Sequence, residues 1–208
     1  MLATRNIIIE LISIVICGVA IGLLMAVTAN AFVQTVDIMT EYRTTLSWME
    51  VDFAGHTYSL SSIPSLLLAA LLITLLRKWL HIKNWEGPAD SIYAAHSEGA
   101  SSDTKKGLGS TLAALIVSSG GGSVGQYGPL VHFGSTIGLF IKNYFKLRMS
   151  PDIFIGCGVA AAISAGFNAP LAGVIFAHEA ILRHFSLRAI APIFIASISA
   201  SAFGEYFF

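Results

Sequence analysis

Charged side chains are scarce in this sequence of 208 residues. They make up 12% of the residues, whereas hydrophobic residues make up 55%; soluble domains average roughly a quarter charged residues. A soluble protein of this length could not bury so much apolar surface, so the composition indicates an integral membrane protein. The formal net charge is zero, which argues against nucleic acid as a partner because a basic surface is lacking.

Cysteine is almost absent as well. Cys17 and Cys157 are the only two, and both lie in apolar runs. This count excludes a disulfide framework and a metal-site spacing, so both thiols are expected to pack as small buried hydrophobes. The sequence also lacks a Gly-Lys-Ser/Thr phosphate loop and a converging nucleophile and base. We therefore expect neither an enzyme nor a bound cofactor or metal.

Two apolar runs are long enough to cross a bilayer. The first extends from Ile7 to Val27 and the second from Leu60 to Leu76, and about 20 apolar residues span the hydrocarbon core. The first run exceeds the core of a signal peptide, which has about 7–15 residues. We therefore interpret it as a retained helix, with cleavage at the small residues 29–31 as the minority alternative.

Lysine and arginine are distributed unevenly around these runs. Segment 28–59 carries four acidic residues and one arginine, whereas segment 77–106 carries five lysines and arginines. The positive-inside rule places the basic segment, and with it the N-terminus with Arg5, in the cytoplasm. The acidic segment would form an external loop, and residues 1–80 would form an antiparallel pair of helices.

Beyond residue 106 the apolar pieces become short and are interrupted by glycine or proline. They cover residues 107–117, 129–141, 153–166, 169–182 and 189–203. Short, broken helices of this kind form the binding sites of many transporters. Irregular backbone is tolerated at membrane depth only where it is buried in protein or lines a cavity. We therefore expect one transmembrane domain over 1–208, with an anion-site region of broken helices over 81–208.

The strongest break is the uncharged stretch SSGGGSVGQYGPLVHFG at 118–134. A helix beginning near Pro129, whose fixed φ suits a first turn, would direct unpaired N–H groups at residues 125–128. Such groups and the helix dipole attract an anion without a formal charge, and partial charges allow its release. His132 is interpreted as a packing or hydrogen-bonding residue. The candidate anion-binding and gating residues are Gly125, Gln126, Tyr127, Gly128, Pro129 and Leu130. The alternative is that the glycines only permit close packing.

Two further junctions have the same form. GFNAPLAG at 166–173 places Pro170 just inside an apolar helix, where the Asn168 side chain can cap unpaired N–H groups. NWEGPADSI at 84–92 places Pro88 in the same way. The candidate residues of a secondary pathway are Phe167, Asn168, Ala169, Pro170, Trp85, Gly87 and Pro88.

These junctions resemble the signatures of the CLC family of chloride channels and proton-coupled chloride antiporters. GGGSVGQYGPLVHFGSTIG is similar to G-[KR]-E-G-P, AAAISAGFNAPLAGVIFAHE to A-x-F-x-A-P-[LI]-x-G-x-x-F-x-x-E, and NWEGP to G-S-G-I-P. The resemblance covers about residues 80–208. It implies an all-α CLC-like bundle of tilted and broken helices, in which this sequence is the first half of an inverted repeat. It also implies a homodimer and a second half-domain in cis or in trans.

The sequence departs from the family pattern where protons are handled. Tyr127 stands where the resemblance places the gating glutamate. A phenol stays neutral near pH 7, so Tyr127 would either donate a hydrogen bond to an anion or plug the site. Ala180 stands at the inner proton-handling glutamate of the antiporters, which leaves His178 and Glu179 as a candidate remnant of that path. Trp85 stands at the anion-coordinating serine.

The sequence therefore predicts a multi-pass integral protein of the plasma or inner membrane. Its function would be channel-like or weakly proton-coupled transport of a small monovalent anion, chloride first, with membrane lipid around it. The alternative is a non-conducting CLC-like interaction or scaffold subunit, or an incomplete half-transporter. Tyr127 and Trp85 favour the alternative, whereas the retained Gly125, Gly128 and Pro129 favour transport.

Overall fold

The computed structural model describes residues 2–45, 50–53, 55–60, 62–97, 103–147 and 149–207. Within these residues the chain is mainly helical, as the resemblance implies. The α-helices are α1 (Leu2–Thr44), α2 (Ser62–Leu80), α3 (Pro88–His96), α4 (Thr104–Ser119), α5 (Tyr127–Tyr144), α6 (Pro151–Phe167), α7 (Pro170–Phe176) and α8 (Leu187–Phe207). A π-helical turn, η2 (Ala177–Leu182), continues α7.

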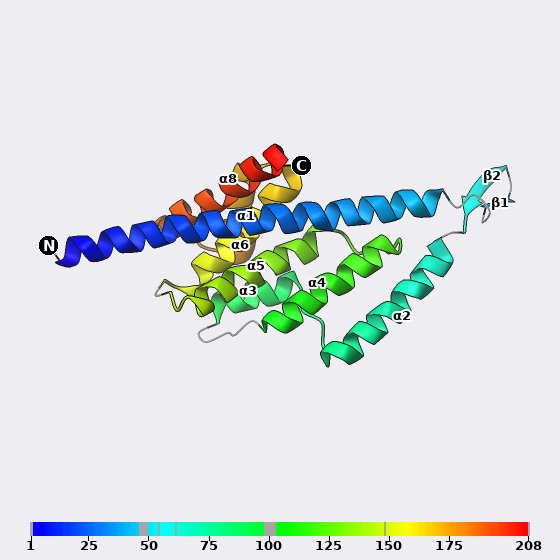
Figure 1. Ribbon diagram of the computed structural model, residues 1–208, viewed down its shortest axis with the longest axis horizontal. Coiled ribbons are helices and arrows are strands. Elements are labelled where there is room, and N and C mark those ends of the chain that lie inside the picture. Colours follow the sequence, from blue (N-terminus) through cyan, green and yellow to red (C-terminus); the bar gives the residue numbers. More distant parts are fainter. Residues whose placement is uncertain are drawn as a thin grey trace.

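Helix α1 is longer than the first apolar run (Figure 1). It has 43 residues, which is about 65 Å at about 1.5 Å per residue. Segment 28–44, expected as the start of an external loop, is therefore helical. It contains neither glycine nor proline, and an apolar stripe at helical spacing continues through it. The buried members of this stripe are Ile21, Met25, Ala29, Phe32 and Val36.

A two-stranded antiparallel hairpin connects α1 to α2. Strand β1 (Glu50–Phe53) pairs with β2 (His56–Ser59), with Phe53 opposite His56. In the turn, Gly55 has a φ of 82°, a left-handed conformation that glycine adopts without steric cost. The expectation of an all-α chain misses this hairpin because each strand has only four residues, too few for a clear alternating pattern.

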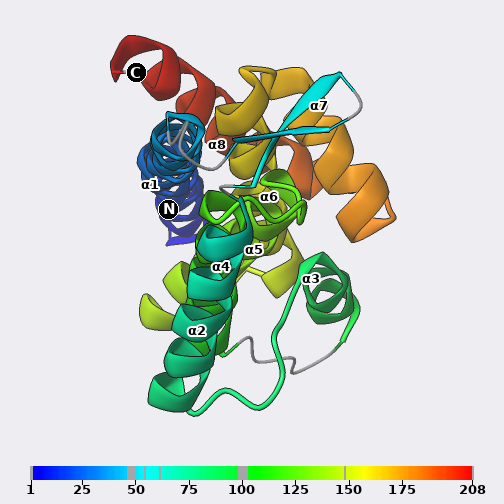
Figure 2. The ribbon, with the colours of Figure 1, turned by 90° about the vertical axis from the view of Figure 1, so that its right-hand side faces the viewer.

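Helices α1 and α2 run in opposite directions, but each packs chiefly against later helices. α1 lies along α8 and α6, and α2 lies along α4 (Figures 1 and 2). A mainly apolar groove of about 590 Å³ lies between α1, α2 and α4. The hairpin therefore connects α1 to α2 along the chain, and the later helices pack against both of them.

Three of the described helices are long and apolar enough to cross a membrane. They are α1 from Ile12 onward, α2 and α8. Helix α2 is the least buried of the three, and its Leu67, Leu71 and Trp79 side chains are exposed. Exposed large apolar side chains in such number are stable when lipid covers them, so the chain is an integral membrane protein. The orientation of the N-terminus stays a prediction, because the side chain of Arg5 is not among those that the structure describes.

Helices α5 and α6 form the most closely packed helix pair. A methyl group added to Gly134, Gly138 or Gly158 would overlap the backbone of the facing helix. Small residues at such positions let helix backbones approach closely inside a membrane. Helix α6 is buried continuously from Ile153 to Ser164, because α1, α5, α7 and α8 surround it. This pair positions the two junctions at the ends of α5 and α6.

Candidate functional site

Helix α5 begins at Tyr127, two residues before the proline that predicts its start. Gln126 precedes it without a side-chain capping bond, and Gly125 turns the chain with a φ of 72°. The first amides of a helix have no acceptor within their own helix. Here Tyr127 and Gly128 supply such amides, whereas Pro129 has no N–H. The next residue, Leu130, is buried.

Helix α3 begins at Pro88, as predicted, and its start meets the start of α5. A methyl group on Gly128 would lie 3.6 Å from the Pro88 ring. The N–H of Gly87 donates to Asp90 Oδ2 at 2.7 Å, which closes the first turn of α3. Trp85 packs its ring toward α4 near Gly109. Two helix N-termini, 39 positions apart in the sequence, therefore lie side by side.

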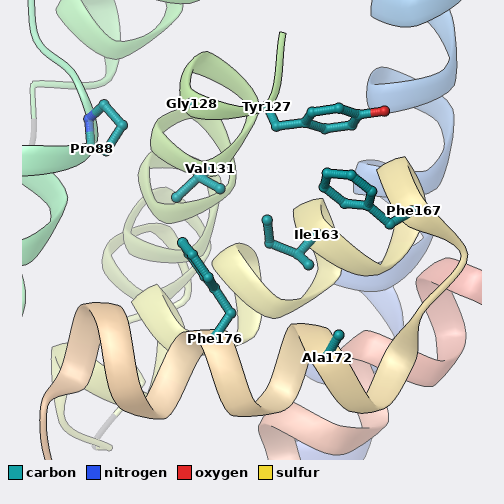
Figure 3. A pocket seen from close by; sticks show the side chains of 8 residues that line it. All are labelled: Pro88, Tyr127, Gly128, Val131, Ile163, Phe167, Ala172 and Phe176. Carbon is teal, nitrogen blue, oxygen red and sulfur yellow. The ribbon is translucent and has the colours of Figure 1, made fainter. Parts of the chain in front are cut away.

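A cavity of about 430 Å³ lies where the starts of α3 and α5 face α6 and α7 (Figure 3). Its lining is almost wholly apolar, and consists of Pro88, Tyr127, Gly128, Val131, Ile163, Phe167, Ala172 and Phe176. The structure thus brings residues from all three predicted junctions to one cavity. Because these side chains offer few polar groups, an anion here would depend on backbone amides.

The Tyr127 ring covers the start of α5 on the side of α6. It stacks on Phe167 with the ring centroids 3.9 Å apart, and Figure 3 shows the two rings face to face. Its hydroxyl donates to the carbonyl oxygen of Gly166 at 3.3 Å. A methyl group on Gly166 would lie 2.5 Å from Cε1 of the ring, so glycine makes room for it. The hydroxyl proton is engaged by the protein, and donation to an anion requires that this bond break.

The junction between α6 and α7 differs from the prediction in one respect. Pro170 is the first residue of α7, as predicted. Asn168, however, does not cap α7. It ends α6 in a left-handed conformation with a φ of 50°, and its side-chain oxygen accepts a hydrogen bond from Ser201 of α8. The capping prediction is wrong because Ala169 separates Asn168 from α7 and the Asn168 side chain is engaged by α8.

His178 and Glu179 differ in burial within η2. His178 is buried, with Nδ1 2.9 Å from the Val174 carbonyl oxygen and its ring against Phe185. Glu179 is exposed. A π-helical turn still places consecutive side chains on different faces, so the structure does not bring these two together. Neither lines the cavity of Figure 3.

Two polar residues near the start of α5, Ser91 and Glu86, were not predicted from the sequence as part of the site. Ser91 Oγ lies 2.9 Å from His132 Nδ1, and Glu86 Oε2 lies 3.8 Å from His132 Nε2. Glu86 could have been singled out in the sequence only by its charge, because the rest of NWEGP is uncharged. Among the residues that the structure describes, no group of three or more His, Cys, Asp or Glu side chains is placed to hold a metal ion.

Comparisons of the sequence give consistent matches. A family model described as voltage gated chloride channel matches residues 66–208. The chain is 30% identical over 212 residues to the H(+)/Cl(-) exchange transporter ClcA of Yersinia pestis bv. Antiqua, covering 93% of this chain and 41% of the relative. It is 30% identical over 135 residues to the voltage-gated ClC-type chloride channel ClcB of Yersinia pseudotuberculosis, covering 64% and 32%. The chain thus spans less than half the length of these curated relatives.

Solved structures have the same fold over almost the whole chain. A CLC-type fluoride/proton antiporter superposes with a TM-score of 0.79 at 21% identity, covering 95% of this chain and 47% of that one. A slow cyanobacterial Cl-/H+ antiporter superposes with a TM-score of 0.71 at 24% identity, covering 93% and 46%. The bundle of tilted and broken helices therefore corresponds to about half of each larger protein.

Proposed function

Because this chain belongs to the voltage-gated chloride channel (CLC) family, we propose that it forms the N-terminal part of a membrane pathway for a small monovalent anion, with chloride the first candidate. The contact between Pro88 of α3 and Gly128 of α5 is the observation that carries this proposal. It joins two helix N-termini beside a cavity that has no basic side chain in its lining.

The chemistry of these helix starts suits an anion that must be released again. Amides at a helix N-terminus carry partial positive charge, and the helix dipole adds to it. Because Pro129 has no N–H, the donors at α5 would be Tyr127 and Gly128. A full cation would hold the anion more firmly, whereas conduction requires easy release.

Transport would be channel-like or weakly coupled to protons. Tyr127 has no carboxylate to compete with the anion, and Ala180 has none to carry an inner proton. His178 and Glu179 are less suited to a shared proton path, because one is buried and the other exposed.

The assembly is also part of the proposal. Because the chain spans 41% of one exchange transporter and 32% of one channel, a second half-domain, in cis or in trans, would complete the pathway. We further expect a homodimer in the inner or plasma membrane, with the N-terminus in the cytoplasm. Lipid would cover the exposed leucines of α2, such as Leu67 and Leu71.

A second candidate function rests on the packing of Tyr127. Its ring stacks on Phe167 and its hydroxyl is bound to Gly166, so the start of α5 is covered on one side. If the ring never moves, the chain acts instead as a non-conducting interaction or scaffold subunit, or as an incomplete half-transporter.

Chloride efflux from liposomes distinguishes the two functions. The protein, produced from its complete reading frame, is reconstituted into phosphatidylethanolamine and phosphatidylglycerol vesicles loaded with potassium chloride. Valinomycin is added to balance charge, and released chloride is measured with a silver chloride electrode. Transport predicts release well above that from protein-free vesicles. Background release from correctly folded, intact assemblies would reject the transport proposal in favour of the scaffold.

A further inference from the structure

A second cavity, of about 310 Å³, lies on the α4 side of the contact between Pro88 and Gly128, and both residues line it. Its titratable side chains are a carboxyl and an imidazole, whereas the cavity of Figure 3 has only the phenol of Tyr127. Glu86 and His132 line it together with Ser110 and Thr111 of α4. The rest of its lining is Gly87, Ala114, Val124 and Pro129. A polar chamber therefore adjoins the start of α5.

The two ring nitrogens of His132 lie in different surroundings. His132 is 2% exposed, and its Nδ1 lies 2.9 Å from Ser91 Oγ, which lies 2.6 Å from Ser135 Oγ. Ser135 donates its own proton to the His132 carbonyl oxygen at 2.7 Å. The His132 carbonyl oxygen also accepts from Thr136 at 2.9 Å. The serine pair thus engages Nδ1, whereas the buried Nε2 has no hydrogen-bond partner.

Glu86 faces that nitrogen. Its Oε2 lies 3.8 Å from His132 Nε2, and its Oε1 lies 3.6 Å from Lys106 Nζ. The backbone N–H of Glu86 donates to Ser110 Oγ at 2.9 Å, which holds the residue beside α4. Burial raises the pKa of the Glu86 carboxyl, and Lys106 opposes this rise. A proton on His132 turns this approach into an ion pair, so the closeness of the two groups favours the binding of a proton.

We propose that Glu86 and His132 together bind one proton, and that this proton strengthens anion binding at the start of α5. The inference rests on the proposed anion pathway. With Glu86 ionised and His132 neutral, the pair carries one negative charge beside the cavity that Gly128 lines. One proton cancels this charge. A proton at the pair and an anion at the amides then favour each other's binding by the same factor.

The more exposed side of the pair lies beside α4. The Lys106 side chain is 44% exposed, that of Glu86 is 20% exposed and that of His132 is 3% exposed. Exposure thus decreases from the start of α4 toward α5. We therefore place the entry of the proton on this side, away from Tyr127.

Two further carboxylates act on Glu86 through their charge, those of Asp90 and Asp103. Asp90 of α3 accepts from Gly87, and Asp103 of α4 accepts from Lys105. On α6, Asp152 pairs with His184 at 3.6 Å. The other titratable groups with described side chains on α3, α5 and the elements packed against them are Tyr93 and His96 of α3, Tyr127, Lys142 and Tyr144 of α5, Cys17, Asp37, Glu41, Tyr42 and Arg43 of α1, Cys157 of α6, and His178 and Glu179 of η2. Among the described residues, Glu86 is the carboxylate paired with His132, and Lys106 is paired with Glu86.

Chloride binding as a function of pH tests the inference. Calorimetry on the purified protein should find tighter chloride binding at about pH 5 than at about pH 8, by roughly tenfold, within the usual range of coupling between two sites. Glu86→Gln should abolish this dependence and keep the tighter binding throughout. His132→Asn, which retains a donor for Ser91, should also abolish it. Glu205→Gln, the same change at an exposed glutamate of α8, should leave it intact.

Each outcome decides a separate question. A wild-type pH profile retained in both Glu86→Gln and His132→Asn overturns the inference but leaves the anion pathway standing. If the wild-type protein binds no chloride at any pH, the proposed function fails instead. NMR of isotope-labelled imidazole nitrogens then still tests the pair: Glu86→Gln should lower the protonation midpoint of His132, and an unchanged midpoint overturns the inference. Size-exclusion chromatography identifies a misfolded variant, and the other variant then decides.

Discussion

The ring of Tyr127 stacks on the ring of Phe167 where α5 begins and α6 ends, with the centroids 3.9 Å apart. A stacked aromatic pair contributes about 0.5–1.5 kcal/mol beyond its burial, and the hydroxyl bond to Gly166 adds about 1 kcal/mol. This cover is stable, yet weak enough to open. The first predictions therefore concern position 127.

Removal of the Tyr127 ring should increase anion flux. Tyr127→Ala deletes the group that covers the start of α5, so we expect chloride efflux from liposomes to rise several-fold. Tyr127→Phe keeps the ring and loses only the hydroxyl bond to Gly166, so its flux should stay close to that of the wild type. Equal flux from the two variants would mean that the ring does not obstruct the pathway.

A carboxylate at the same position should add a pH dependence. Tyr127→Glu places an acid at the start of α5, where an ionised carboxylate competes with chloride for the Tyr127 and Gly128 amides. Flux should therefore be lower at neutral pH and recover in acid, more steeply than in the wild type. Efflux measured over a pH series checks this. Tyr127→Gln, which is isosteric with the glutamate but neutral, is the control, and an identical profile in the two variants would place position 127 outside the pathway.

The turn before α5 depends on glycine at one position but not at its neighbour. Gly125 has a φ of 72°, and an alanine in this left-handed region costs about 1–2 kcal/mol. At Gly128 an added methyl group makes only an ordinary contact with Pro88 at 3.6 Å. Gly125→Ala should therefore lower the midpoint temperature of thermal unfolding in detergent, whereas Gly128→Ala should leave it unchanged. The reverse order would contradict the described turn.

The contact between α5 and α6 should tolerate no added methyl group. In Gly158→Ala the new Cβ meets the backbone carbonyl of Gly134, and such overpacking typically costs about 1–3 kcal/mol. Gly204→Ala is the control, because its methyl group meets only the Asn30 side chain at 3.4 Å. Differential scanning calorimetry in detergent should detect a loss of thermal stability for Gly158→Ala alone. Similar losses of stability in both variants would contradict the tight contact.

The half-buried carboxyl of Glu86 should make stability depend on pH. Its pKa is raised in the folded protein, so the folded state binds the proton more tightly than the unfolded state. This stabilisation is complete below the ordinary glutamate pKa and is lost as the pH rises through the higher folded value.

In the wild type, the free energy of unfolding should decline as the pH rises through the pKa of Glu86. Glu86→Gln has no carboxyl to titrate, so we expect this part of the decline to be absent from the variant. Denaturation in detergent over a pH series measures the difference. Glu205→Gln should follow the wild-type curve, since that side chain is exposed. Parallel curves for wild type and Glu86→Gln would show that the carboxyl titrates normally.

Much of the junction geometry could be predicted from sequence because proline restricts where a helix begins. Pro88 and Pro170 are the first residues of α3 and α7, and α5 begins two residues before Pro129. The extension of α1 beyond Val27 was harder to predict, because its polar residues were read as a loop. A narrow buried stripe, including Phe32 and Val36, is sufficient to continue a helix there.

Contacts between distant segments could not be predicted in the same way. Glu86 and His132 approach each other only because α3 and α5 begin side by side, and the crossing of two helices leaves no local sequence pattern. The engagement of Asn168 by Ser201 of α8 is a similar case. Capping was expected from the nearest helix, whereas the partner came from a segment 33 residues later.

The backbone contact between Gly134 and Gly158 limits how the site can open. Two helices that touch backbone to backbone cannot slide past each other without separating along their whole interface. The first residue of α5 and the last residue of α6 therefore stay in fixed register. Movement at the aromatic cover is left to rotation of single side chains about their own bonds, which requires no rearrangement of the helices.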